Sequence, residues 1–144
     1  MLQNLRPIKD EDCTLLFKWA NDEDVRENSL DSRKIKWKQH KSWFNQKLTS
    51  SFSKIFILEY NDLPVGQIRY DLNANGIWDI DYSIDKNYRG LGFGRKMVEL
   101  SLNKIAGEKR AVVQLNNIAS RKVFEHLGFE ISKSDGEIIE YLYK

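Results

Sequence analysis

The sequence feature that most constrains the fold is a glycine-rich loop between a strand and a helix. Residues 78–85, Trp-Asp-Ile-Asp-Tyr-Ser-Ile-Asp, alternate apolar and polar side chains, which predicts a half-buried strand. The loop 89–94, Arg-Gly-Leu-Gly-Phe-Gly, follows, and then a helix that we expect to run to about Ala106. Glycines let backbone N–H groups approach an anion, and a helix start adds partial positive charge. Because residues 86–96 also contain four basic side chains and no acidic one, the segment predicts a phosphate or pyrophosphate site.

A glycine-rich loop alone is also compatible with a structural turn or a dinucleotide-binding fingerprint. Asn75-Gly76 predicts a hairpin before the strand, so the strand does not belong to an N-terminal βαβ unit. A dinucleotide fold would place a ribose-binding acid about 20 residues further on, where this chain has the apolar run 110–115. No Gly-Lys-Ser/Thr follows the loop, which excludes a Walker A motif.

The remaining pattern predicts one α/β domain built around a mixed sheet, which suits a chain of 144 residues with 41% hydrophobic residues. After an N-terminal strand, helices are expected at about 10–20, 35–48 and 118–127, besides the helix after the loop. Strands are expected at 54–60, 65–72, 78–85, 110–115, 129–132 and 137–143.

Composition excludes several classes of protein. The 23 basic and 21 acidic residues are nearly balanced, which argues against a dedicated nucleic-acid binder. One cysteine and two histidines predict neither an internal disulfide nor a metal site. No apolar stretch suits a membrane helix or a signal peptide, so we expect a cytoplasmic protein, and a homodimer stays open.

The loop and the C-terminal third together resemble the GNAT family of acetyl-CoA-dependent N-acetyltransferases. Residues 89–94 match its motif A, Arg/Gln-x-x-Gly-x-Gly/Ala. Its motif B is Asn, a small residue, an aromatic residue and Gly-Phe, and here it reads Asn117, Ser120, Phe124, Gly128 and Phe129. The resemblance implies a mixed, mostly antiparallel sheet with about four helices and a splayed strand pair that binds acetyl-CoA. The implied cofactor contacts are Tyr82, Ser83, Ile84, Arg89, Gly90, Leu91, Gly92, Phe93, Gly94, Arg95, Asn117 and Phe124.

Several residues fit either a chemical role in the reaction or a purely structural role. N-acetyl transfer needs a base for the amine and a proton donor for the departing thiolate. Asp81, and next Asp79, are the candidate bases, although both could simply keep a strand face soluble. The family commonly places a tyrosine donor where this chain has Phe124, so the donor is left among Tyr82, Tyr88 and water. Asn117 fits a helix N-cap as well as a cofactor ligand.

The N-terminal third predicts the acceptor site. Its pattern is similar to that of GNAT enzymes which acetylate amino groups of nucleotide-linked deoxy-sugars, as in pseudaminic-acid biosynthesis; the residues are Trp19, Asn21, Arg26, His40 and Trp43. The basic run 31–41 would attract a diphosphate, although it could equally be a solvated helix face, and His40 could pack in the core. A protein N-terminus as acceptor and a non-catalytic acetyl-CoA-binding module are the alternatives.

Overall fold

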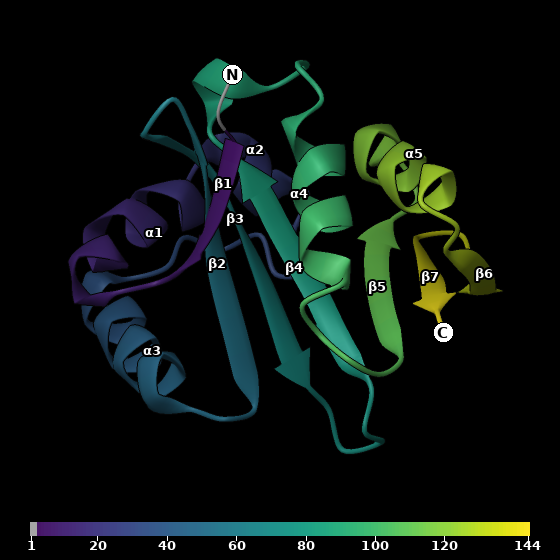
Figure 1. Ribbon diagram of the computed structural model, residues 1–144. Helices are drawn as coiled ribbons and strands as arrows, with labels where there is room; N and C mark the ends of the chain where they lie inside the picture. The colour runs from purple at the N-terminus through teal and green to yellow at the C-terminus, as the bar shows by residue number, and fades with distance from the viewer. Residues whose placement is uncertain (1–2) are drawn as a thin grey trace.

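Seven strands form one sheet in the order β1-β2-β3-β4-β5-β7-β6, in a computed structural model that describes residues 3–144 (Figure 1). The strands are β1 Gln3–Pro7, β2 Ser53–Tyr60, β3 Leu63–Leu72, β4 Trp78–Ile84, β5 Lys109–Gln114, β6 Glu130–Ser134 and β7 Ile138–Tyr143. The helices are α1 Cys13–Ala20, α2 Glu23–Glu27, α3 Trp37–Thr49, α4 Phe93–Leu102 and α5 Ile118–His126, with 3-10 turns η1 Asp10–Asp12 and η2 Lys86–Tyr88. Every neighbouring pair is antiparallel except β4 and β5, which confirms the predicted mixed α/β sheet.

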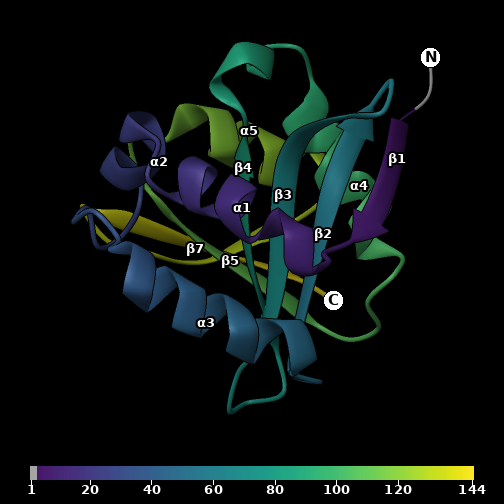
Figure 2. The same ribbon diagram turned by 90° about the vertical axis from the view of Figure 1, so that its left-hand side faces the viewer.

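Helices cover both faces of the sheet. Figure 2 shows α1, α2 and α3 in front of the strands, with α4 and α5 behind them. The first face buries a small cluster from α1, α3 and β2: Leu16, Trp19, Phe44, Ile55 and Ile57. The second face buries the larger core, in which Met97 and Val98 of α4 and Phe124 of α5 pack on Ile68 and Tyr70 of β3. No helix within residues 3–144 is long and apolar enough to cross a membrane.

The pairing between β4 and β5 is short, and this splits the sheet. The two strands are in register only at Trp78 with Lys109 and at Asp79 with Arg110. Within the described residues, β4 has no partner in β5 from Ile80 onward, whereas β5 stays paired with β7 along its length. Figure 1 shows the two strands diverging toward their carboxyl ends. The expected splayed pair is confirmed.

Two local predictions differ from the structure. Helix α4 ends at Leu102, not near Ala106, because Asn103 forms its C-cap and the N–H of Lys104 turns back to the Ser101 carbonyl. The helix α2 was not expected and brings the count of α-helices among residues 3–144 to five. Its five residues are too few to show a periodicity, and the Asp22 side chain starts it by accepting from the N–H groups of Asp24 and Val25.

An Arg6–Asp12 ion pair ties the turn before α1 to strand β1. Both Asp12 oxygens accept from Arg6, at 2.8 and 2.9 Å, and the Lys9 N–H donates to the same carboxylate at 2.8 Å. Burial raises the pKa of the Asp12 carboxyl, but the Arg6 and Lys9 hydrogen bonds outweigh it, and the net pKa is lower than usual. Because the folded-state pKa is depressed, this stabilisation is present above the unfolded-state pKa and is lost as pH falls through the folded-state value.

We expect Asp12→Asn to lower the free energy of unfolding at pH 7 by about 1–3 kcal/mol, because the substitution removes the buried carboxylate that pairs with the partly buried Arg6. The variant should also show a smaller fall in stability between neutral pH and about pH 3, below the unfolded-state value of about 3.9. Urea unfolding at several pH values measures both. Asp10→Asn is the matched control because Asp10 is exposed on the same turn. If the free energy of unfolding of Asp12→Asn and of wild type falls equally as the pH is lowered, the prediction is contradicted.

Candidate active site

The gap between β4 and β5 is bordered by side chains of opposite character on its two faces. Tyr82 lies in register with Ile68 of β3, which belongs to the core under α4 and α5. Asp81 lies in register with Arg69, which is opposite Ile55 of the cluster under α1 and α3. Residues that are directly opposite on neighbouring strands share a face, so Tyr82 faces α4 and α5, and Asp81 faces the other side. The predicted alternation along this strand is confirmed.

The loop at the open end of the gap depends on glycine for two different reasons. Gly90 and Gly92 have φ angles of 75° and 86°, and Gly92 is the N-cap of α4. Side-chain-bearing residues rarely adopt these angles. Gly94 instead allows a close approach, because a Cβ there would lie 3.1 Å from the Tyr82 ring. The glycines therefore leave the loop backbone uncovered at positions 90 and 92 and let the start of α4 pack against Tyr82 of β4.

Arg89 is occupied by partners within the chain. Its Nη2 and Nη1 atoms pair with Asp22 at 2.8 Å and Asp24 at 2.9 Å, and its Nε donates to the Ile84 carbonyl at 3.0 Å. The guanidinium thus ties α2 to the phosphate loop, and it uses one of the β4 carbonyls that the resemblance assigned to the cofactor. The expected surplus of positive side-chain charge at the loop rests mainly on Lys86 and Arg95, because Lys96 pairs with Glu99 at 3.5 Å.

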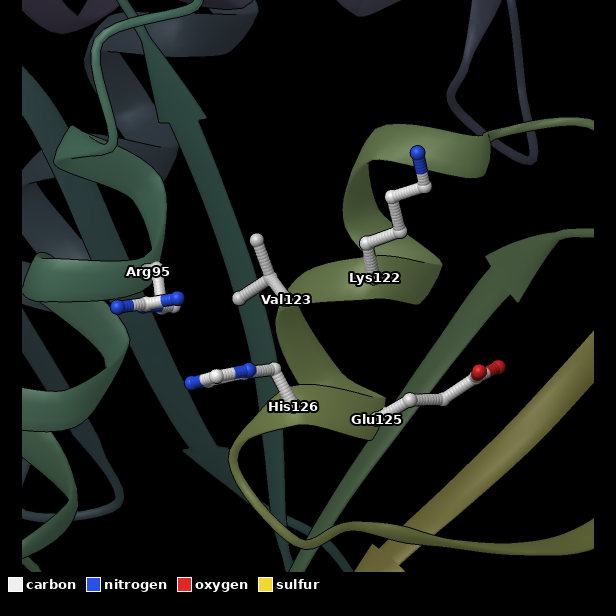
Figure 3. A pocket seen from close by; sticks show the side chains of 5 residues that line it. All are labelled: Arg95, Lys122, Val123, Glu125 and His126. Carbon is white, nitrogen blue, oxygen red and sulfur yellow. The ribbon is translucent and has the colours of Figure 1, made fainter.

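A pocket of about 420 Å³ lies between α4 and α5 (Figure 3). Arg95 comes from α4, and the other lining side chains come from α5: Lys122, Val123, Glu125 and His126. Figure 3 shows Arg95 and His126 in the gap between the helices and Glu125 pointing away from it. Arg95 lies in the first turn of α4, so the pocket adjoins the glycine loop, and Arg95 and Lys122 bring two positive charges to its lining.

The two candidate bases have different surroundings. The Asp79 carboxylate accepts from Arg110 at 2.6 Å, and Arg110 also pairs with Glu140 at 3.3 Å. The Asp81 side chain is 58% exposed, and its nearest cation, Arg69, is 3.8 Å away. Asp79 therefore makes a short ion pair, while Asp81 makes only long contacts, with Arg69 and with Gln67 Nε2 at 3.5 Å, and its carboxylate stays mostly exposed beside the gap.

Motif B residues on α5 serve packing and capping. The Asn117 side chain accepts from the Ser120 N–H at 3.3 Å, which confirms the N-cap role. Phe124 is 1% exposed and packs edge-on against Phe129 and Tyr82. The Tyr82 hydroxyl reaches Ser120 Oγ at 3.1 Å. Burial raises the pKa of Tyr82, and the Ser120 hydrogen bond only partly offsets this.

The residues expected to bind the acceptor hold the N-terminal segment together. Trp19 and His40 are each 3% exposed, so neither offers a face for stacking in this structure. Trp19 donates to Asp85 at 2.9 Å, and His40 Nε2 donates to the Cys13 carbonyl at 2.9 Å. Arg69 lies over the Trp43 ring, 5.2 Å from its centroid.

Asn21 and Arg26 shape the loop between α2 and α3. Asn21 exchanges two hydrogen bonds with the backbone of Ile35, both at 2.7 Å. Arg26 donates to backbone carbonyls of Ala20, Asp31 and Arg33. Direct acceptor contacts of these five residues stay a prediction, and the structure gives each a scaffolding role.

A second pocket, which the sequence did not predict, lies on the Asp81 face at the carboxyl end of β5. It encloses about 640 Å³, and its lining is Leu30, Gln114, Leu115, Asn116, Gly136, Glu137 and Ile138. Gln114 donates to the Ser29 carbonyl at 2.9 Å and so fixes the loop 28–36 over this end of the sheet. The residues come from three distant segments, and no local motif could have indicated them. Within residues 3–144 no group of His, Cys, Asp and Glu could hold a metal ion.

Comparison with known proteins identifies the family. The acetyltransferase (GNAT) domain family model matches residues 4–130, so the chain belongs to this family. An uncharacterised protein of Methanocaldococcus jannaschii is 29% identical over 97% of this chain, which spans only 30% of that protein's length. A solved domain from the same organism is 27% identical with a TM-score of 0.82, covering 99% of this chain and 97% of that one.

A third relative shares the fold at lower identity. The spermidine N-acetyltransferase of Vibrio cholerae, solved with CoA and spermine, is 14% identical with a TM-score of 0.86, covering 98% of this chain and 94% of that one. This likeness agrees with the family assignment and shows that the chain has the α/β GNAT fold.

Proposed function

We propose that this chain is an acetyl-CoA-dependent N-acetyltransferase that acetylates the primary amine of a nucleotide-linked amino-deoxy sugar, with Asp81 as the base. The observation that carries the proposal is the gap between β4 and β5, which has a basic glycine loop at its open end and Asp81 exposed on one face. A thioester in this gap would be reached by an amine from the α1–α3 side. The acceptor and the cosubstrate would then approach from different sides of the sheet.

The acetyl-CoA contacts follow the loop and the strand. Backbone N–H groups of residues 89–94 would hold the pyrophosphate, because the left-handed glycines leave them uncovered. The backbone groups of Tyr82, which point into the gap, would pair with the pantetheine amides, whereas those of Ser83 point toward β3. Arg95 and Lys122 in the pocket between α4 and α5 suit the adenosine end and its phosphate.

Asp81 would take the amine proton as the amine attacks the thioester carbonyl. Acetyl-CoA supplies the activated acetyl group, and the chain supplies position and proton transfer. Asp81 suits the base role better than Asp79, because the Asp79 carboxylate is already engaged by Arg110.

The acceptor class rests on the loop between α2 and α3 and on the start of α3. Lys34, Lys36, Lys38 and Lys41 are exposed there, and the structure shows none of them in an ion pair within residues 3–144. Arg33, by contrast, pairs with Asp31 at 2.7 Å. Uncompensated lysines that follow Leu30 of the second pocket along the chain would attract a diphosphate and repel a polyamine.

Gly92→Val should raise the Kd of acetyl-CoA tenfold or more, a cost of about 1.4 kcal/mol or above, because it distorts the phosphate loop. Calorimetry on the folded variant measures this. Gly76→Val is the matched control, because Gly76 has a φ of 77° with open space around it but lies in the hairpin before β4. Unchanged affinity in Gly92→Val, or an equal loss in both variants, would contradict the loop placement.

Asp81→Asn should lower kcat/KM by roughly 10²-fold with little change in acetyl-CoA affinity, since general-base catalysis is lost. Asp79→Asn is the matched variant: it should affect stability more than turnover, because it breaks the Arg110 ion pair. Steady-state kinetics and urea unfolding separate the two. A larger kinetic loss in Asp79→Asn would move the base to that residue.

The acceptor is tested by comparing kcat/KM for a UDP-linked amino-deoxy sugar, the same sugar without nucleotide, spermidine and short peptides. We expect the nucleotide-linked amine to be best, and Lys36→Ala to raise its KM. Lys54→Ala is the control, because Lys54 is exposed at the start of β2. A peptide or spermidine as the best substrate would overturn the sugar, and acetyl-CoA binding without turnover of any amine would indicate a non-catalytic module.

A further inference from the structure

The Tyr82 side chain bridges the two halves of the split sheet on the α4–α5 face. Its backbone belongs to the part of β4 that lacks a β5 partner, and its hydroxyl lies 3.1 Å from Ser120 in the first turn of α5. Gly94 of α4 permits this position, since a Cβ there would press on the ring. A cosubstrate arm that runs from the phosphate loop into the gap therefore has to pass this hydroxyl.

The reaction needs a donor at this place. When the thioester C–S bond breaks, the sulfur leaves as a thiolate that must be stabilised and protonated. Phe124, one helical turn beyond Ser120, has no proton to give and is buried among aromatic rings. Tyr88 lies beyond the end of β4 and packs against Phe93, 6.2 Å between ring centroids. Tyr82 alone of these three offers a hydroxyl across the gap.

We propose that Tyr82 is the proton donor to the departing thiolate and that Ser120 is its positioning residue. The proposal rests on the proposed function, in which the thioester lies in this gap. The amine nitrogen forms the new C–N bond and loses its proton to Asp81, and the C–S electron pair goes to sulfur. Sulfur takes the Tyr82 proton, and solvent returns a proton to the phenolate through the Ser120 hydroxyl.

The strand geometry keeps the two proton transfers apart. Asp81 and Tyr82 are consecutive, so they point to opposite faces of the sheet. The base thus serves the amine on one side of the gap, while the phenol serves the sulfur on the other. Burial raises the pKa of Tyr82, so the phenol is protonated at neutral pH.

The test uses the thiol of bound CoA as a probe that requires no acceptor. Ultraviolet absorbance of the thiolate, followed against pH, gives the pKa of CoA bound to wild type and to Tyr82→Phe. A lost hydrogen bond to sulfur should raise the bound-thiol pKa by about one unit, a tenfold smaller ionisation constant. Ser120→Ala should give a smaller rise in the same direction. With the best amine of the acceptor panel, Tyr82→Phe should lower kcat by roughly 10²-fold.

Tyr70→Phe is the matched control. Tyr70 makes the same kind of strand-to-helix bond, 2.6 Å to Ser101 on α4, but it is wholly buried in the core. Both variants lose one tyrosine–serine bond, and both keep the titratable and charged groups of the surrounding elements: Asp81 on β4, Arg95 on α4, and Lys122, Glu125 and His126 on α5. We expect Tyr70→Phe to lower stability and to leave the bound-thiol pKa unchanged.

Each outcome has one meaning. An unchanged bound-thiol pKa in Tyr82→Phe, or an equal shift in Tyr70→Phe, overturns the donor assignment while the proposed function stands. Failure of wild type to bind CoA in calorimetry overturns the placement of the cosubstrate itself, and the donor assignment falls with it. A shift confined to Tyr82→Phe and Ser120→Ala supports the pair.

Discussion

The active-site arrangement depends on the point where β4 and β5 stop pairing. That point coincides with an ion-pair network across three strands: Asp79 of β4, Arg110 of β5 and Glu140 of β7. Beyond it, β5 follows β7 and β4 follows β3, so backbone groups that a continuous sheet would use are left for a ligand. The pairs are only partly buried, and each is worth about 1 kcal/mol or less. Their main effect is therefore on where the strands part rather than on overall stability.

Two buried or partly buried contacts join the N-terminal helices to the cofactor side. Trp19 of α1 donates to Asp85 at the end of β4, and Arg89 of the phosphate loop pairs with Asp22 and Asp24 of α2. Asp22 also caps α2, so one carboxylate fixes both the start of that helix and the loop arginine. The segment 28–36, which covers the second pocket, is thus held relative to the phosphate loop. These contacts therefore connect the α1–α3 side of the sheet directly to the glycine loop and the end of β4.

The sequence predicted those parts of the molecule whose signals are local. The alternation along 78–84, the glycines of 89–94 and the N-cap at Asn117 are each determined by neighbouring residues, and the structure agrees with all three. The roles of Trp19 and Arg89 could not be predicted in this way, because their partners lie far along the chain. The sequence pattern predicted that Trp19, Asn21 and Arg26 bind the acceptor; in the structure their polar atoms bind backbone and carboxylate groups of the scaffold, and the acceptor contacts stay a prediction. The second pocket is likewise assembled from separate segments.

The position of Phe124 gives a physical reason for the donor to come from the strand. Phe124 and Ser120 are four residues apart on α5 and so share one face of the helix. Phe124 is packed against Phe129, Tyr141 and Tyr82, where a hydroxyl would have to find a partner or cost about 1–3 kcal/mol. Ser120 lies one turn nearer the open end, outside this aromatic cluster, and already accepts or donates a hydrogen bond to Tyr82. An aromatic side chain at 124 therefore stabilises the core and packs against the Tyr82 ring. The hydroxyl that we propose as the donor belongs instead to Tyr82 of β4 and is hydrogen-bonded to Ser120 in the first turn of α5.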